Sequence, residues 1–338
     1  MLNEKELASN GIFSWELYKD KLNPDLLLGN GFTLQFSKSF AYKSLFKIFL
    51  DNCNEDLAKL IPEFETYNFE EIQKYMEYAK IINSSLNIEC NQLNESLNVL
   101  KFGLIKTINS VHPKANEVDF TQLENIAKQL HNFNNIFTTN YDLFLYHIVM
   151  KSVDIKKAKT IKDYISYQDY FFGNYAPVGF KQLMDEQKET YKHIYYLHGA
   201  LFLFKEDGND IKLIKNNNEE LIDLISFEIN SDRFPTFITE GDSKLKLKSI
   251  KENFYLSFCL RKLKDANAPI LIFGNSLSEF DKHIINALKE NHNTLFYALY
   301  TKGKNEVELR NEKYNILSKF NGTKVEVTFI DSKTVFKL

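Results

Sequence analysis

Residues 25–33 read Asp-Leu-Leu-Leu-Gly-Asn-Gly-Phe-Thr, and this stretch decides the fold of the chain. A short apolar strand, Asp25 to Leu28, ends at a Gly-x-Gly turn, and a helical pattern follows from about Ser39. Five further short runs are rich in β-branched or aromatic residues and are bounded by Gly, Asn or Pro, as strands buried on both faces are. They are Asn135 to Thr138, Ile194 to Leu197, Ile270 to Phe273, Leu295 to Tyr300 and Val325 to Ile330. Because helical patterns alternate with these strands, we expect an α/β fold with a mainly parallel sheet of about six strands flanked by helices.

A large helical insertion separates the first two predicted strands. A connection between a strand and the next helix is normally far shorter than this segment. Its helical periodicity is clear at Phe40 to Leu50, Phe69 to Ile82, Leu93 to Val111 and Phe120 to Leu130. We therefore expect residues 1–338 to form a single domain with a helical insertion at residues 40–131, packed on or beside the sheet.

A second irregular stretch, Lys151 to Lys192, is rich in aromatic residues. These are Tyr164, Tyr167, Tyr170, Phe171, Phe172 and Tyr175. Packing in the core and in a lid is the favoured interpretation, and a stacking platform for a planar ligand is the alternative.

The composition excludes a disordered chain and argues against a nucleic-acid-coating protein. Hydrophobic residues make up 44% of the 338 residues, which is enough for a packed interior. The 42 Lys and Arg are balanced by 45 Asp and Glu, giving a formal net charge of -3. Only Arg233, Arg261 and Arg310 carry guanidinium groups. We therefore predict no direct binding of nucleic acid.

The cysteines and the apolar runs favour a reduced, cytoplasmic protein. Cys53, Cys90 and Cys259 are widely spaced and form no CxxC pair or Cys/His cluster, so neither a disulfide framework nor a structural metal is expected. The first 17 residues contain no basic region followed by an apolar stretch, and no apolar run approaches the roughly 18 residues of a membrane span. We expect no membrane contact.

Four short segments follow predicted strands, at the carboxyl ends where open α/β sheets bind ligands. The first is Gly29 to Thr33, whose glycines would let the backbone approach a pyrophosphate, although such a turn is often only a tight turn. The second, Thr138 to Asp142, reads Thr-Thr-Asn-Tyr-Asp. Helix capping by Asn140 or Asp142 is the alternative there.

The third and fourth segments follow later strands. His198 is followed by a glycine in Leu-His-Gly, and its pKa near neutrality makes it the best general base of the set, with a purely structural histidine as the alternative. The fourth segment, Gly274 to Ser278, leads into a helix. There Asp281 is expected to cap or anchor the helix, more than to contact a ligand, and His283 to orient a loop.

Together and in this order, the four segments resemble the sirtuin-like superfamily. Its sequences carry a Gly-rich turn after the first strand, a Thr-x-Asn-x-Asp motif, a His-Gly pair and a late Gly-x-Ser-Leu turn. Here these are Gly29 to Thr33, Thr138 to Asp142, His198-Gly199 and Gly274 to Leu277. The resemblance spans roughly residues 25–300 and implies a Rossmann-like fold. The forms Thr-Thr-Asn-Tyr-Asp, Leu-His-Gly and Ser-Leu-Ser-x-x-Asp are similar to the bacterial branch found in anti-phage defence, as is the segment from Phe234 through the Lys-rich helix Leu245 to Leu263.

The resemblance implies that NAD is the substrate and that its nicotinamide–ribose bond is hydrolysed. Asn140 would hold a ribose hydroxyl or position the attacking water, Asp142 would orient the nicotinamide side, and His198 would be the general base. The implied catalytic residues are Asn140 and His198. The implied NAD-binding residues are Gly29, Asn30, Gly31, Thr33, Thr139, Asp142, Gly274 and Ser276.

The chain departs from the deacylating members of that superfamily. It has neither their two CxxC pairs nor their Gly-Ile-Pro-Asp-Phe-Arg stretch; Leu34 to Lys38 stands in its place. Water is therefore the expected acceptor, giving nicotinamide and ADP-ribose and depleting NAD in abortive infection. The alternatives are a non-catalytic NAD or ADP-ribose-binding module, and an NAD-dependent ADP-ribosyltransferase or deacylase.

Uncontrolled NAD loss would kill a cell, so such an enzyme needs an off state. The helical insertion and residues 164–175 are candidate lids or oligomer contacts. By analogy with the defence branch, we expect a homo-oligomer, a partner ATPase or sensor protein, or both.

Overall fold

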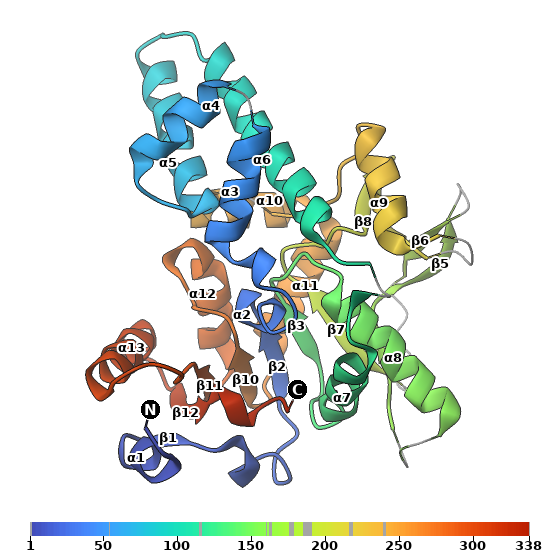
Figure 1. The fold of residues 1–338 in the computed structure, drawn as a ribbon, viewed down its shortest axis with the longest axis vertical. Coiled ribbons are helices and arrows are strands. Elements are labelled where there is room, and N and C mark those ends of the chain that lie inside the picture. Colours follow the sequence, from blue (N-terminus) through green and yellow to red (C-terminus); the bar gives the residue numbers. More distant parts are fainter. Residues whose placement is uncertain are drawn as a thin grey trace.

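A parallel sheet of eight strands forms the centre of the computed structural model (Figure 1). The structure describes residues 2–337 apart from 54, 115–116, 160, 162–163, 176–178, 185–190, 216–218 and 239–240. The strand order is β1-β12-β11-β10-β2-β3-β7-β4, and every neighbouring pair is parallel. The expected α/β fold with a mainly parallel sheet flanked by helices is therefore confirmed.

The six predicted strands are all present in this sheet. They are β2 (Asp25–Leu28), β3 (Ile136–Thr138), β7 (Lys192–Tyr196), β10 (Ile270–Phe273), β11 (Thr294–Leu299) and β12 (Glu326–Asp331). The sheet has two more strands than the six expected, because β1 (Ile12–Phe13) and β4 (Tyr167–Gln168) pair at its two edges. A strand of two residues carries no periodic pattern, so neither one could be predicted from local periodicity.

Helices pack around the sheet in two groups (Figure 1). One group is α7 (Phe120–Leu130) and α8 (Phe144–Ala158), which contact each other. The other is α10 (Ser243–Glu252), α11 (Phe254–Asp265) and α12 (Lys282–Asn291). The remaining helices outside the insertion are α1 (Glu4–Ser9), α2 (Asn30–Thr33), α9 (Leu221–Asn230) and α13 (Glu306–Lys319). With both faces covered, every residue of β2, β3 and β10 is buried.

Four helices form a lobe that extends away from the sheet (Figure 1). This helical lobe consists of α3 (Tyr42–Asn52), α4 (Glu55–Leu60), α5 (Phe69–Ser85) and α6 (Asn91–Val111). It has its own apolar interior, in which the rings of Phe46 and Phe49 meet Phe69 edge to face. The fourth predicted helix of residues 40–131, α7, packs on α8 beside the sheet.

A second, antiparallel sheet lies outside the parallel one. Its order is β5-β6-β9-β8, from β5 (Phe171–Tyr175), β6 (Phe180–Leu183), β9 (Asn209–Leu213) and β8 (Leu203–Glu206). These strands were not predicted from the sequence. The signal that could have found one pair is Asp207-Gly208, where both residues have positive φ, the turn that best fits a two-residue hairpin.

The aromatic stretch that runs into β5 packs largely in the core, as the favoured interpretation of its sequence expects. Tyr164, Tyr167 and Tyr170 are buried, and the Tyr167 hydroxyl donates to the carbonyl oxygens of Leu130 and Phe133, both at 2.7 Å. The Tyr175 side chain lies outside the described residues.

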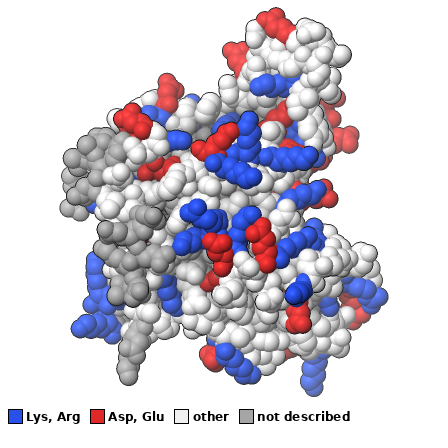
Figure 2. Space-filling model, turned by 180° about the vertical axis from the view of Figure 1, so that it is seen from behind, with Lys and Arg blue, Asp and Glu red and all other residues white. Residues whose placement is uncertain are grey.

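Charged side chains of both signs cover the face shown in Figure 2. Lys and Arg lie beside Asp and Glu there, in keeping with the near-neutral net charge. Among the described residues, no helix combines the length and apolarity that crossing a bilayer requires.

A single methyl group tests how tightly the lobe is packed. A Cβ at Gly103 in α6 would lie 3.1 Å from Cδ2 of Phe49, a ring that is buried against α6, so the ring would have to move. Gly103→Ala should therefore lower the free energy of unfolding by about 1–3 kcal/mol, although the same change in an exposed helix raises it by up to about 1 kcal/mol. Urea unfolding measures the difference. The control, Asn98→Ala at an exposed position of the same helix, should be neutral or slightly stabilising, and a stabilising Gly103→Ala would contradict the packing.

Candidate functional site

A cavity of about 510 Å³ opens at the carboxyl ends of the central strands. Its floor comes from the turns after β2, β3, β7 and β10, and its roof from the helical lobe. Strands β2 and β10 are neighbours, but the chain runs from β2 to β3 on one side and from β10 to β11 on the other. Such a reversal of strand order leaves a crevice, and open α/β sheets bind their ligands there.

Three glycines bring the two turns of this crevice into backbone contact. The Gly29 amide donates to Phe273 O at 3.0 Å, and the Gly31 amide donates to Gly274 O at 2.8 Å. A Cβ on Gly31 would lie 2.6 Å from the Cα of Gly274, whose φ is +68°. Gly274 lines the cavity, whereas Gly29 and Gly31 lie behind its wall with their amides already bonded. The main reason for glycine at these positions is therefore the close approach of the two turns.

Asn140, Asp142 and Thr33 join the first turn to the second predicted segment. Asn140 donates from Nδ2 to Gly29 O and to Thr33 Oγ1, both at 3.0 Å. Thr33 in turn donates to Asp142 Oδ2 at 2.5 Å. Asn140 and Asp142 line the cavity, while Thr33 is buried and does not. The structure therefore gives Thr33 a supporting contact below the floor.

Asp142 also holds the start of α8. Its Oδ1 accepts from the amide of Phe144 at 2.9 Å, so the helix-capping alternative describes the contact that is observed. Burial raises the pKa of this carboxyl, although the hydrogen bonds from Thr33 and Phe144 oppose the rise. Both carboxylate oxygens already have donors, which leaves the amide of Asn140 as the more available group. Asn140 Oδ1 has no hydrogen bond within the described part of the chain.

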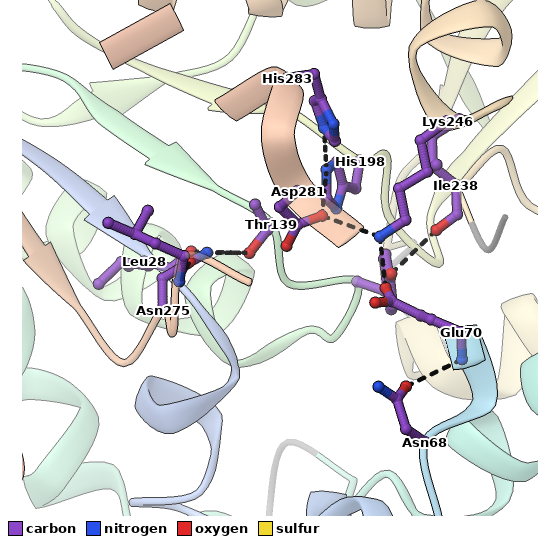
Figure 3. Close-up of polar contacts among 12 residues, drawn as sticks. Leu28, Asn68, Glu70, Thr139, His198, Ile238, Lys246, Asn275, Asp281 and His283 are labelled. Carbon is purple, nitrogen blue, oxygen red and sulfur yellow. Dashed lines mark hydrogen bonds and ion pairs between the residues drawn. The ribbon is translucent and has the colours of Figure 1, made fainter. Parts of the chain in front are cut away.

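Thr139 and the turn after β10 meet across the crevice (Figure 3). Asn275 donates from Nδ2 to Thr139 Oγ1 at 3.2 Å, and its Oδ1 accepts from the Leu277 amide at 2.8 Å. Asn275 was not among the predicted site residues, although it lies between two that were, Gly274 and Ser276. Thr139, Asn275 and Ser276 all line the cavity, as does Asn30 from the first turn.

His198 stands at the end of β7 and lines the cavity with only 2% of its surface exposed. The positive φ of Gly199 lets a neighbouring segment pack closely, so that the Ile238 amide donates to His198 O at 2.9 Å. The Nε2 atom of His198 lies 2.8 Å from Nε2 of His283 and 3.8 Å from Asp281 Oδ1. His198 is thereby held both through its backbone carbonyl and through its imidazole ring.

Both histidines are neutral near pH 7. Burial lowers the pKa of His198 well below its ordinary value, against the opposing effect of Asp281. Burial likewise lowers the pKa of His283 to about 4. Two neutral rings that face each other through Nε2 share one proton, so one ring donates and the other accepts. His198 can then take up a proton as a base.

A buried ion cluster adjoins the two rings and was missed in the sequence (Figure 3). The Lys246 ammonium, fully buried, lies 2.6 Å from Glu70 Oε1 and 2.9 Å from Asp281 Oδ1. Glu70 belongs to the helical lobe and Lys246 to α10, and both Glu70 and Asp281 line the cavity. Burial would raise the pKa of Asp281, but Lys246 and the two histidines outweigh it and lower that pKa. No sequence pattern distinguishes this buried lysine from the surface lysines around it.

The structure corrects the expected roles of Asp281 and His283. Asp281 stands at the start of α12, but its side chain makes no capping hydrogen bond there, because its carboxylate binds Lys246. His283 was expected to orient a loop, and its ring contacts His198 instead. The first correction depends on Lys246 of α10, 35 positions away, and the second on the turn after β7, 85 positions away.

His198, Asp281 and His283 could together hold a metal ion, since one ligand atom from each lies within 4.8 Å of the others. The Lys246 ammonium already binds the Asp281 oxygen, and the two Nε2 atoms are at hydrogen-bond distance. The arrangement therefore favours a hydrogen-bonded network, and our expectation of no metal stays a prediction.

The glycine contact can be tested with a matched pair of variants. Gly274→Ala and Gly303→Ala both place a side chain at positive φ, +68° and +79°, but only the first has neighbours within 4 Å, the nearest being the Phe32 amide nitrogen at 2.5 Å. Both changes should cost about 1 kcal/mol for the backbone angle, and Gly274→Ala should cost at least 1–3 kcal/mol more. Chemical unfolding measures the free energy of unfolding of both variants. Equal losses would show that the two turns can move apart without cost.

Residues 26–336 match the family model DUF4917, which is described as a domain of unknown function. No curated protein matches the sequence. The matched range includes the whole cavity floor and the helical lobe. Since it covers most of the chain, the protein belongs to the DUF4917 family.

Proposed function

We propose that the protein is an NAD⁺ glycohydrolase that releases nicotinamide and ADP-ribose. One observation carries this proposal: His198 and Asn140, far apart in the sequence, line one cavity at the crevice between β2 and β10. A Rossmann-like arrangement with Gly-rich turns at this point is suited to a dinucleotide.

The cavity offers the surfaces that such a ligand requires. Its volume of about 510 Å³ lies within the roughly 300–1,000 Å³ typical of small-ligand sites. Thr139, Asn140 and Ser276 supply polar groups on the floor for ribose hydroxyls and phosphates. An apolar part of the cavity wall suits a planar ring; its residues are Leu34, Phe40, Ala41, Leu45, Leu104 and Ile108.

The chemistry needs a base and an acceptor close to the ribose. Cleavage of the bond between the nicotinamide nitrogen and C1′ of the ribose passes through an oxocarbenium-like centre, as glycoside hydrolysis does. Neutral His198 would accept a proton from a ribose hydroxyl or from the attacking water. The oxygen of that water joins C1′, and the bonding pair leaves with neutral nicotinamide. Asn140 Oδ1 would accept from a ribose hydroxyl.

In this proposal the protein depletes NAD during phage infection, under the control of oligomerisation or of a partner ATPase or sensor. The sirtuin-like motifs support this biological setting by analogy.

A second function is favoured by a specific observation. His198 is almost fully buried, and both Asp142 oxygens already have donors, as expected of a pocket that binds NAD or ADP-ribose without chemistry. Calorimetry that finds affinity for ADP-ribose, together with no release of nicotinamide under any condition, would favour this regulatory module.

Removing the proposed base should abolish most turnover. We expect purified protein to release nicotinamide from NAD⁺, and His198→Ala to lower the rate by about 10²–10⁴ because the proton has no acceptor. Chromatography of the products measures the rate, and thermal unfolding confirms the fold. His193→Ala, in strand β7 before His198 and outside the cavity, is the control. Equal rates for His198→Ala and wild type would reject the enzymatic role.

The lowered pKa of His198 also predicts the pH dependence. A base must be deprotonated, and burial holds this pKa well below 6.5. We therefore expect kcat/KM to stay level as the pH falls from 8 through 6.5, and to decline only in more acidic solution. A decline centred at pH 6.5 or above would show that His198 is not the base, or that it is solvated when the enzyme works.

A further inference from the structure

The buried cluster beside His198 forms a continuous chain from the helical lobe to the cavity (Figure 3). Glu70 lies at the start of α5, and its backbone amide is held by Asn68 Oδ1 at 3.0 Å. Its carboxylate binds Lys246, Lys246 binds Asp281, and Asp281 faces His198. Three packed elements, α5, α10 and the start of α12, thus contribute one charged group each.

The backbone keeps these elements in contact. Gly241, just before α10, lies so close to the backbone of Glu70 and Lys74 that any side chain there would clash. Tyr78 of α5 donates to Asp242 Oδ2 at 3.4 Å. The lobe is therefore docked on the segment that carries Lys246.

The charges of the cluster leave one negative charge unbalanced. Burial raises the pKa of Glu70, and the attraction of Lys246 opposes the rise. With Glu70 and Asp281 both ionised, Lys246 is the single cation beside them, and both histidines are neutral. Among the described residues, Asp281, Lys246 and His283 act on the His198 ring, and the Tyr42 phenol lies near Glu70, Lys246 and Asp281. A buried cluster with one unbalanced negative charge stabilises a proton taken up by the neighbouring imidazole.

We propose that His283 and Asp281 are positioning residues for His198, and that Lys246, tied to Glu70 of the lobe, sets the charge that His198 experiences. This inference rests on the proposed function and deepens it. His283 holds the His198 ring through the bond between their Nε2 atoms, which fixes the rotamer and the nitrogen that carries the proton. Asp281 stabilises the imidazolium that forms when His198 accepts a proton. The lobe is thereby part of the catalytic arrangement, because its position determines whether Lys246 is paired with Glu70 as well as with Asp281.

Two variants separate these roles. His283→Gln keeps a polar side chain but loses the facing ring, so kcat should fall about 10- to 100-fold with little change in KM. Lys246→Met removes the cation and takes the cluster charge from -1 to -2, so the cluster should bind its proton at higher pH. The acid limb of kcat/KM should therefore move upward.

Three controls exclude a merely structural effect. His292→Gln alters another buried histidine, whose ring contacts Ala268 O and Leu263 O; it should lower thermal stability without moving the pH profile. Glu279→Gln changes an exposed carboxylate close to Asp281 and should change neither. Because Lys246→Met leaves two carboxylates unpaired, the double variant Lys246→Met/Glu70→Gln, whose cluster charge returns to -1, is made in parallel. Its acid limb should lie near that of the wild type.

A second readout does not depend on turnover. The ring nitrogen signals of the seven histidines can be followed by NMR in ¹⁵N-histidine-labelled protein, with His198 assigned from His198→Asn. His283→Gln should change the tautomer signature of His198, and Lys246→Met should raise the midpoint of its titration.

The outcomes separate this inference from the proposed function. If the wild type cleaves NAD⁺ but His283→Gln leaves kcat unchanged and Lys246→Met leaves the acid limb in place, the positioning roles are wrong and the hydrolase proposal stands. If the wild type shows no turnover under any condition, the hydrolase proposal fails on its own. The spectra then decide: unchanged His198 signals in both variants overturn the coupling, and changed signals support it.

Discussion

The contact between the turns after β2 and β10 is the constraint on which the rest of the structure depends. Gly31 donates its amide to Gly274 O, and neither turn has room for a side chain at the point where they meet. The chain leaves β2 and β10 in opposite directions across the sheet, and this contact holds the two turns together where they diverge. Backbone contact at this point fixes the floor of the cavity, and Thr33 supports Asn140 and Asp142 of that floor from below.

The second constraint is electrostatic and comes from the lobe. A buried ammonium is tolerated only when carboxylates surround it, and Lys246 finds one in the lobe and one at the start of α12. Lobe docking and the environment of His198 are therefore not independent. An insertion that could have served only as a roof instead provides Glu70 to the charge balance of the site.

Local chemistry explains which site residues the sequence could reveal. Asn30, Thr139, Asn140, Asp142, His198, Gly274 and Ser276 follow strands that are clear from their apolar runs, and parallel strands bring their carboxyl ends to one edge. Gly29, Gly31 and Thr33 have the same sequence signal but lie behind the cavity wall. A motif indicates the turn, and only the packing of the second turn against it shows which atoms remain free.

The sequence by itself determined the parallel sheet, its six longer strands, the helical insertion and the polar turns, because these follow from hydrophobic periodicity and from the residues that end strands. Only the tertiary structure decided the two-residue edge strands, the second sheet and the cluster of Glu70, Lys246, Asp281 and His283. The physical reason is the distance along the chain over which each kind of interaction acts. Periodicity is a property of neighbours in the chain, whereas a buried ion pair joins groups up to 176 positions apart and leaves no local pattern.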